Sequence, residues 1–187
     1  MIYSSVNVIY CILAAILIWQ LWLKEYVSYW TLNNIQINGY TYKVRDRPAA
    51  ELLAQLHQQL KTVIRQLNRD SPNSSSVQRL VKGFDQTQLI ERPEFHQFTS
   101  YTVNKGQKIV FCLRQTDGTL VDLNTLMFVG LHELAHIMTE RVDDHSSHNA
   151  EFWKNYEQLL RTAQTLNLYR YHDYKSNSVE YCGYLIN

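Results

Sequence analysis

The sequence of 187 residues predicts one α+β domain that follows an N-terminal transmembrane helix. An uncharged apolar run lies near the N-terminus, short runs with strand-like alternation come after it, and longer stretches then repeat their apolar residues at helical spacing. The 45% share of hydrophobic residues is enough for one domain core. The predicted boundaries are 1–28 for the anchor and 29–187 for the domain.

Residues 8–23 (VIYCILAAILIWQLWL) carry no charge, and glutamine is their only strongly polar side chain. A helix rises about 1.5 Å per residue, so this run and its flanks can just cross a hydrocarbon core of roughly 30 Å. Tryptophan and tyrosine gather at its ends, as they do at membrane–water interfaces. A cleaved signal peptide is disfavoured because no Lys or Arg precedes the run and no small-x-small site follows it. A buried helix is disfavoured because the run has no polar face.

Flanking charges predict the orientation of this helix. Only the terminal amine precedes the run, whereas Lys24, Lys43, Arg45 and Arg47 follow it. The positive-inside rule therefore places domain 29–187 on the cytosolic side or inside another membrane-bounded particle. We expect a single-pass membrane protein, with a virion as one candidate location.

Composition and charge argue against two other classes of protein. The net charge is +1 and the basic residues are scattered, so direct binding to nucleic acid is not indicated. Cys11, Cys112 and Cys182 lack CxxC spacing, which indicates neither a disulfide scaffold nor a cysteine zinc site. A reducing compartment fits this set best, and a bridge between Cys112 and Cys182 is the less favoured alternative.

The first half of the domain is expected to contain a strand region and a long helix. Residues 29–44 alternate polar and apolar side chains around an Asn-Gly pair, which predicts a short strand or a hairpin. Leucine, valine and isoleucine at helical spacing predict a helix over 47–69. This helix ends at the loop 70–76 (DSPNSSS).

The second half is expected to alternate in a similar way. A short helix is predicted over 77–84, and strands over 100–103 and 108–114 form a hairpin around an Asn-Lys-Gly turn. Asp122 is then placed to cap a helix that runs to about Arg141.

Two histidines on this capped helix are the strongest functional signal. His132 and His136 lie one turn apart in the pattern HExxH, with Glu133 directly after the first. At about 100° per residue, both histidines fall away from the apolar stripe that includes Met127 and Leu131. Two imidazoles so placed can bind one zinc ion, while Glu133 can accept a proton from a water on the metal.

The third ligand has to come from residues beyond this helix. A metzincin site is excluded because position 142 is valine and no methionine follows in the chain. His148 is favoured because it begins a second amphipathic helix, which would hold a ligand rigidly. His145, in a looser segment, is a less favoured alternative, as are the carboxylates of Glu151 and Glu157.

HELAH, a loop and then His148 in H-N-x-x-F-W together resemble the WLM family of zinc metallopeptidases, which lies near the SprT/Spartan-type proteases. The resemblance extends over about residues 80–187 and includes WLM-like proteins of large DNA viruses. It implies a zincin-like domain with a small sheet, the HExxH helix and a following helix. It also implies zinc bound by His132, His136 and His148, and peptide hydrolysis with Glu133 as the general base.

These inferences predict a membrane-anchored zinc protease that acts on a protein or peptide substrate. The alternative is a structural or assembly component of a membrane-containing virus particle, with viral capsid or membrane proteins as partners. An intact Glu133 favours the protease, because a purely structural zinc ion needs no base there.

Two secondary expectations concern the surroundings of the site. Strand 108–114 either lines the cleft and binds an extended substrate or is an internal strand of the sheet. The tail 171–187 is rich in aromatic residues and is expected to pack back on the domain, where it could restrict the cleft. The sequence does not choose among the candidates for an additional donor to the reaction, which are His145, Tyr171, Tyr174 and Tyr181.

Overall fold

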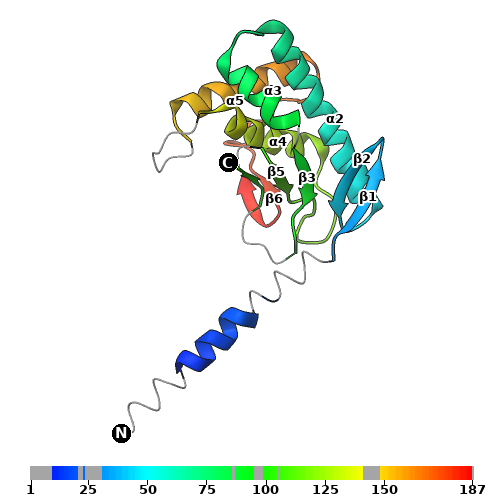
Figure 1. Cartoon of the computed structure of the whole chain (residues 1–187), viewed down its shortest axis with the longest axis vertical. Helices are drawn as coiled ribbons and strands as arrows, with labels where there is room; N and C mark the ends of the chain where they lie inside the picture. Colours follow the sequence, from blue (N-terminus) through cyan, green and yellow to red (C-terminus); the bar gives the residue numbers. More distant parts are fainter. Residues whose placement is uncertain are drawn as a thin grey trace.

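The computed structural model describes residues 10–20, 23, 31–85, 87–94, 99–104, 106–140 and 148–186. Within these ranges the chain forms a mixed α+β domain, as the sequence predicts, with a five-stranded sheet and a separate two-stranded hairpin. Figure 1 shows the labelled helices gathered on one side of the sheet.

The sheet combines antiparallel hairpins at its two edges with parallel pairing in its centre. Its strand order is β1-β2-β3-β5-β4, in which β2–β3 and β3–β5 are parallel. The predicted first hairpin is confirmed, and Asn38 and Gly39 both have positive φ in its turn, as two-residue hairpin turns require. The strands are β1 (Asn33–Ile37), β2 (Tyr40–Val44), β3 (Gln88–Glu91), β4 (Tyr101–Val103) and β5 (Lys108–Phe111).

The order of the strands decides between the two expectations for the second hairpin. β5 pairs with β3 on one side and with β4 on the other, so it is an internal strand and cannot add a substrate strand. β4 lies at the edge of the sheet instead. β3 was not predicted, because four residues are too short for a periodic signal and its position depends on parallel partners far away in sequence.

The helices largely follow their predicted ranges, and side-chain caps explain where they begin. Asp46 caps the first by accepting a hydrogen bond from the Ala49 amide at 3.0 Å, and Asp122 caps the HExxH helix. The HExxH helix ends at Met138, before the predicted end. The helices are α2 (Arg47–Asp70), α3 (Ser75–Asp85), α4 (Leu123–Met138) and α5 (Ala150–Thr165).

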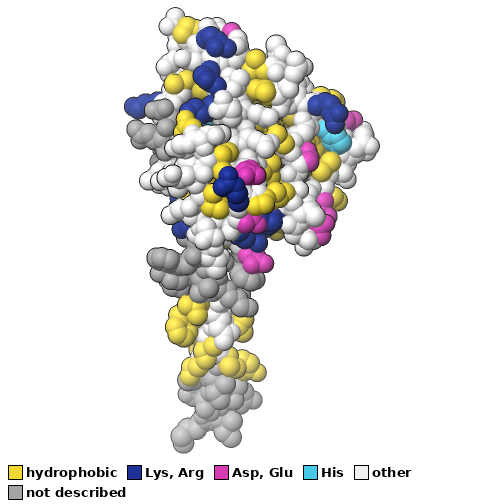
Figure 2. Space-filling view, turned by 90° about the vertical axis from the view of Figure 1, so that its right-hand side faces the viewer, with side chains coloured by type: hydrophobic (Ala, Val, Ile, Leu, Met, Phe, Trp, Pro, Cys, Tyr) yellow, Lys and Arg dark blue, Asp and Glu magenta, His cyan; other side chains and the backbone are white. Residues whose placement is uncertain are grey.

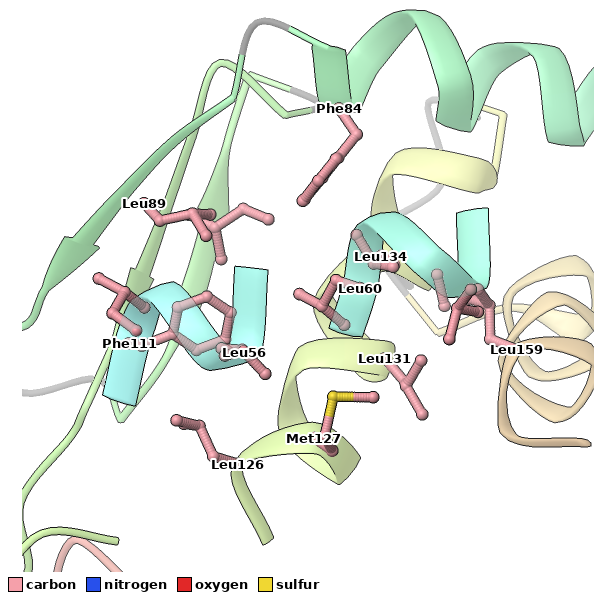
Figure 3. Packing of buried hydrophobic residues seen from close by; sticks show 14 of the residues in the cluster. Leu56, Leu60, Phe84, Leu89, Phe111, Leu126, Met127, Leu131, Leu134 and Leu159 are labelled. Atoms are coloured by element: carbon pink, nitrogen blue, oxygen red, sulfur yellow. The ribbon is translucent and has the colours of Figure 1, made fainter. Parts of the chain in front are cut away.

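The core lies between α2, α4 and the sheet (Figure 3). Met127 and Leu131 of the predicted apolar stripe are fully buried against α2 and α5, which confirms the two-sided character of α4. Gly130 allows close helix packing, because a Cβ there would lie 3.2 Å from Leu56 and 3.3 Å from Leu60. The core thus holds α4 tightly by one face and leaves its histidine face for other contacts.

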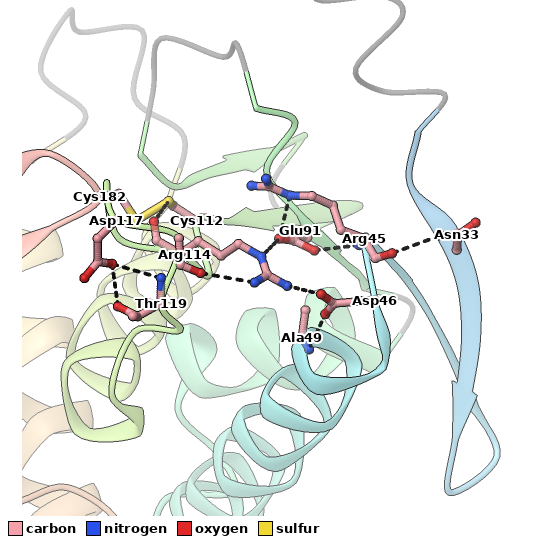
Figure 4. Close-up of polar contacts among 11 residues, drawn as sticks. Asn33, Arg45, Asp46, Ala49, Glu91, Cys112, Arg114, Asp117, Thr119 and Cys182 are labelled. Carbon is pink, nitrogen blue, oxygen red and sulfur yellow. Dashed lines mark hydrogen bonds and ion pairs between the residues drawn. A yellow bond between two sulfur atoms is a disulfide. The ribbon is translucent and has the colours of Figure 1, made fainter.

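A buried carboxylate ties the start of α2 to the sheet. Glu91 is fully buried and accepts hydrogen bonds from the Arg45 amide at 2.7 Å and from the Arg45 guanidinium at 3.0 Å (Figure 4). The Arg114 guanidinium lies 3.3 Å from the same carboxylate and 2.5 Å from that of Asp46. These contacts compensate the Glu91 charge, which would otherwise be very unfavourable at zero exposure.

A disulfide joins Cys112 and Cys182, contrary to the favoured expectation of reduced cysteines. The two cysteines are separated by 70 positions and share no local sequence signal, because their proximity depends on how the tail folds. The tail forms the hairpin β6 (Val179–Tyr181) and β7 (Tyr184–Ile186), and the Tyr181 hydroxyl donates to the Cys112 carbonyl at 2.9 Å. The expectation that the tail packs back on the domain is therefore confirmed.

The expectation of a single-pass membrane protein is wrong for the part of the chain that the structure describes. No helix there is both long and apolar enough to cross a membrane. Parts of the predicted run 8–23 lie outside the described residues. The predicted orientation and virion location, which depended on the anchor, lose their support, and the boundary at residue 29 stays a prediction.

Candidate metal centre

Three histidines converge at the end of α4 and the start of α5. A ligand nitrogen from each of His132, His136 and His148 lies within 4.8 Å of the others. The Nε2 atoms of His132 and His148 are 3.1 Å apart, and each pair of ring centroids is separated by 4.9–5.0 Å. The structure thus brings together the same three histidines that the sequence selected as a ligand set.

Local sequence explains how His148 reaches the other two. Asn149, rather than the serines before it, caps α5 by accepting a hydrogen bond from the Phe152 amide at 2.9 Å. His148 therefore lies just before the cap instead of in the first turn. Phe152 is fully buried, and its ring centroid lies 4.6 Å from those of His136 and His148 and 4.9 Å from that of His132. One phenylalanine ring thus supports all three imidazoles.

The chemistry of this cluster suits zinc. Burial, together with the nearby His136 and His148, lowers the pKa of His132 to about 3, which keeps its imidazole neutral. A neutral imidazole retains the nitrogen lone pair that a metal needs, and a set of three histidines matches a catalytic zinc site with one open position. The residues present therefore fit a zinc ion.

Glu133 lies on a different face of α4 from the histidines, beside the sheet. Its side chain is 4% exposed, and its Oε2 accepts a hydrogen bond from the Thr102 hydroxyl of edge strand β4 at 2.6 Å. Burial raises the pKa of Glu133 to about 7, although the Thr102 hydrogen bond works in the opposite direction. Thr102 was not predicted, because nothing in the local sequence shows that β4 packs beside α4.

The carboxylates considered as alternative ligands have other partners. Glu151 forms an ion pair with Arg79 at 2.6 Å, and Glu157 forms one with Arg161 at 2.5 Å. Neither belongs to the histidine cluster among the described residues. The remaining alternative, His145, lies outside the described residues.

The tyrosines considered as additional donors lie in different environments. Tyr171 is 69% exposed, Tyr174 packs its ring 4.4 Å from that of Phe128, and Tyr181 is buried. The described ring contacts of the histidines come from α4 and α5 rather than from the tail. Tyr156, which sequence reasoning missed, lies closer, with its ring centroid 5.4 Å from that of His132. Its helical spacing from Phe152 indicated only a core residue.

The face drawn in Figure 2 shows no concentrated basic patch. In Figure 2 the Lys and Arg side chains are spread over the visible face, between hydrophobic and acidic ones.

Two viral proteins are similar to parts of this chain. An uncharacterized protein of Acanthamoeba polyphaga mimivirus is 38% identical over 100 residues, which cover 53% of this chain and 49% of that protein. An uncharacterized protein of Invertebrate iridescent virus 6 is 37% identical over 73 residues, which cover 37% of this chain and 38% of that protein. The chain therefore matches half or less of the length of these curated relatives.

The chain is also similar to a solved structure and to a family model. The crystal structure of Wss1 from Saccharomyces cerevisiae matches 65% of this chain and 84% of its own, with 19% identity and a TM-score of 0.44. The family model described as the WLM domain matches residues 35–181, a range that begins well before the resemblance over about residues 80–187. This match covers most of the sequence, with the histidine cluster inside it, and the chain therefore belongs to the WLM family.

Proposed function

We propose that this chain is a zinc-dependent peptidase in which His132, His136 and His148 hold the metal and Glu133 is the general base. Membership of the WLM family points to a metallopeptidase. The observation that carries the finer assignment is the convergence of three histidine nitrogens within 4.8 Å, next to a buried glutamate in the HExxH pattern.

The side chains of this site have distinct tasks in peptide hydrolysis. Zinc, when bound, lowers the pKa of the attacking water and polarises the carbonyl of the scissile bond. Glu133 accepts one proton from the water as the water oxygen adds to the carbonyl carbon. It then transfers that proton to the peptide nitrogen, so that the C–N bond breaks and the amine leaves. Thr102 holds the Glu133 carboxylate through its 2.6 Å hydrogen bond.

Edge strand β4 is the element we assign to substrate binding. It pairs with β5 on one side and is the last strand of the sheet. An extended peptide can form backbone hydrogen bonds with such an edge, which would carry it past Thr102 and Glu133. No specific observation favours the alternative of an assembly component of a virus particle, and capsid or membrane proteins as partners stay a prediction.

Hydrolysis of peptides by the full chain tests this proposal. A quenched fluorescent peptide library is incubated with the zinc-loaded chain, with Glu133→Gln and with His172→Ala. His172 is the matched control because its ring nitrogen lies 2.7 Å from the Asn177 carbonyl, outside the cluster. We expect activity in the parent and in His172→Ala, and a loss of at least about 100-fold in Glu133→Gln, because general-base catalysis contributes that much. Equal activity in Glu133→Gln would contradict the assigned role.

A further inference from the structure

One arginine of α3 connects the end of α4 with the start of α5. The Nε atom of Arg79 donates a hydrogen bond to the Met138 carbonyl at 3.1 Å, and a terminal nitrogen of the same guanidinium donates to the Glu151 carboxylate at 2.6 Å. Met138 is the last residue of α4, and Glu151 lies in the first turn of α5. We call the contacts of Arg79 with Met138 and Glu151 the Arg79 clamp.

Glu151 strengthens the connection through its second carboxylate oxygen. Oε1 accepts from Arg79, whereas Oε2 accepts a hydrogen bond from the Glu140 amide at 3.2 Å, just after α4. Both charges suit their positions, since a carboxylate is favourable at the start of a helix and a cation at the end, where the backbone carbonyls lack partners within the helix. The end of α4 and the start of α5 are thus joined by complementary groups.

The Arg79 clamp lies close in sequence to histidines on both of its sides. His136 is two residues before Met138, and His148 is three residues before Glu151. His132 and His136 belong to one helix, which sets their separation. His148 precedes α5, so its distance from the other two histidines depends on how the start of α5 is held against the end of α4.

A second, buried contact joins the same two helices one turn further along α5. The Asn155 amide donates to the Thr139 hydroxyl at 3.1 Å, and that hydroxyl donates to the Ala135 carbonyl at 2.7 Å. Glu151 and Asn155 are four residues apart and therefore share one face of α5. Two contacts one turn apart fix the direction of a helix as well as its distance from a neighbour. Loss of the first contact should therefore displace His148, even though the second remains.

We propose that Arg79 is a positioning residue for the metal centre, which holds His148 where it can bind the same zinc ion as His132 and His136. The proposal rests on the proposed function, because it requires His148 to be a ligand, and it adds a residue that does not touch the metal. The Arg79 charge by itself would have the opposite effect, since a nearby cation opposes the binding of a dication. Removal of Arg79 weakens zinc binding only if its contacts, rather than its charge, are what matters.

Zinc affinity of the full chain tests the proposal. The dissociation constant is measured by competition with a chromophoric chelator for the parent, Arg79→Ala and Arg161→Ala. Arg161 is the matched control, because it also pairs with a glutamate of α5, Glu157, but in an exposed i,i+4 pair. We expect the Kd of Arg79→Ala to rise about 10-fold, at the lower end for groups that orient metal ligands, because the Asn155 contact remains. Arg161→Ala should stay within about twofold of the parent. An unchanged or lower Kd in Arg79→Ala, or an equal rise in both variants, would overturn the proposal.

A double-mutant cycle shows whether the two sides of the clamp act together. Glu151→Ala should also weaken zinc binding, and Arg79→Ala/Glu151→Ala should bind zinc within about twofold of the weaker single variant, because each single change already breaks the clamp. A purely structural role would leave these affinities unchanged, since a protein that loses some stability is still almost entirely folded under native conditions. Effects that multiply in the double variant would contradict the clamp.

These measurements require no peptide cleavage, so they separate the positioning role from the peptidase assignment. Weaker zinc binding in Arg79→Ala supports the positioning role even where the parent cleaves no peptide, and only the peptidase assignment is then lost. Cleavage by the parent together with equal zinc affinity in Arg79→Ala overturns the positioning role and leaves the peptidase intact.

Discussion

Replacement of Phe152 by alanine is the sharpest structural test of how the histidine cluster is built. The Phe152 ring is fully buried and lies within 4.9 Å of the ring centroids of His132, His136 and His148. Its neighbour Trp153 contacts the same region but is 54% exposed. The two aromatic residues therefore form a matched pair for mutation, because Phe152 packs on the cluster in the interior and Trp153 lies at the surface.

The magnitude follows from burial. Removal of a fully buried phenylalanine side chain costs about 3–5 kcal/mol through lost transfer energy and the cavity that remains. Phe152→Leu retains much of the volume and should cost about 1–2 kcal/mol. Trp153→Ala should cost less than about 1 kcal/mol, because half of its surface is in solvent already. Loss of the ring should also weaken zinc binding by about 10- to 100-fold, as removal of groups that orient metal ligands does.

Urea denaturation of the metal-free chain, followed by circular dichroism, gives the unfolding free energies. Competition with a chromophoric chelator gives the zinc affinities of the same three variants. The reasoning would be refuted if Phe152→Ala and Trp153→Ala lost equal stability, or if Phe152→Ala bound zinc as tightly as the parent.

Three further predictions concern stability. Burial lowers the pKa of His57 to about 4, so the unfolded chain binds more protons than the folded chain between pH 6.5 and 4. The resulting stabilisation is present above pH 6.5 and falls by roughly 3 kcal/mol as the pH is lowered to 4. Urea titrations of metal-free protein should show that part of the slope missing in His57→Gln, and equal slopes would contradict it. Glu91→Ala should cost about 3–5 kcal/mol because it removes the carboxylate that pairs with Arg45 and leaves Arg114 with Asp46 alone, while Glu51→Ala, in an exposed pair, should cost less than about 0.5 kcal/mol. Reduction of the Cys112–Cys182 bridge, which closes a 70-residue separation, should lower the unfolding free energy by about 4 kcal/mol, and an unchanged thermal midpoint in dithiothreitol would exclude that contribution.

Helix α4 and the histidine cluster could be predicted because their sequence patterns are local. Asp122, the apolar stripe of α4 and the two histidines one turn apart all depend on helical periodicity over a few residues. His148 could be selected over His145 because a rigid helix follows it, and the structure brings His148 to the cluster. The role of His148 as a metal ligand and the role of Glu133 as a general base stay predictions.

Features that depend on tertiary contacts were missed or mistaken. Strand β3 is stabilised by parallel neighbours, and Thr102 meets Glu133 only because β4 is the edge strand beside α4. The bridge between Cys112 and Cys182 requires the tail hairpin to fold back on the sheet. The apolar run 8–23 predicts a transmembrane helix, whereas no helix among the described residues is both long and apolar enough to cross a membrane.

Zinc stoichiometry of the full chain tests the central claim most directly. The metal content of purified protein, measured by mass spectrometry after dialysis, is compared with that of His148→Ala, His145→Ala and His172→Ala. We predict one zinc per chain in the parent, in His145→Ala and in His172→Ala, and less than about a tenth of that in His148→Ala, because two remaining imidazoles hold zinc weakly. Full zinc retention in His148→Ala, or no zinc in the parent, would contradict the assignment of the three histidines as a metal centre.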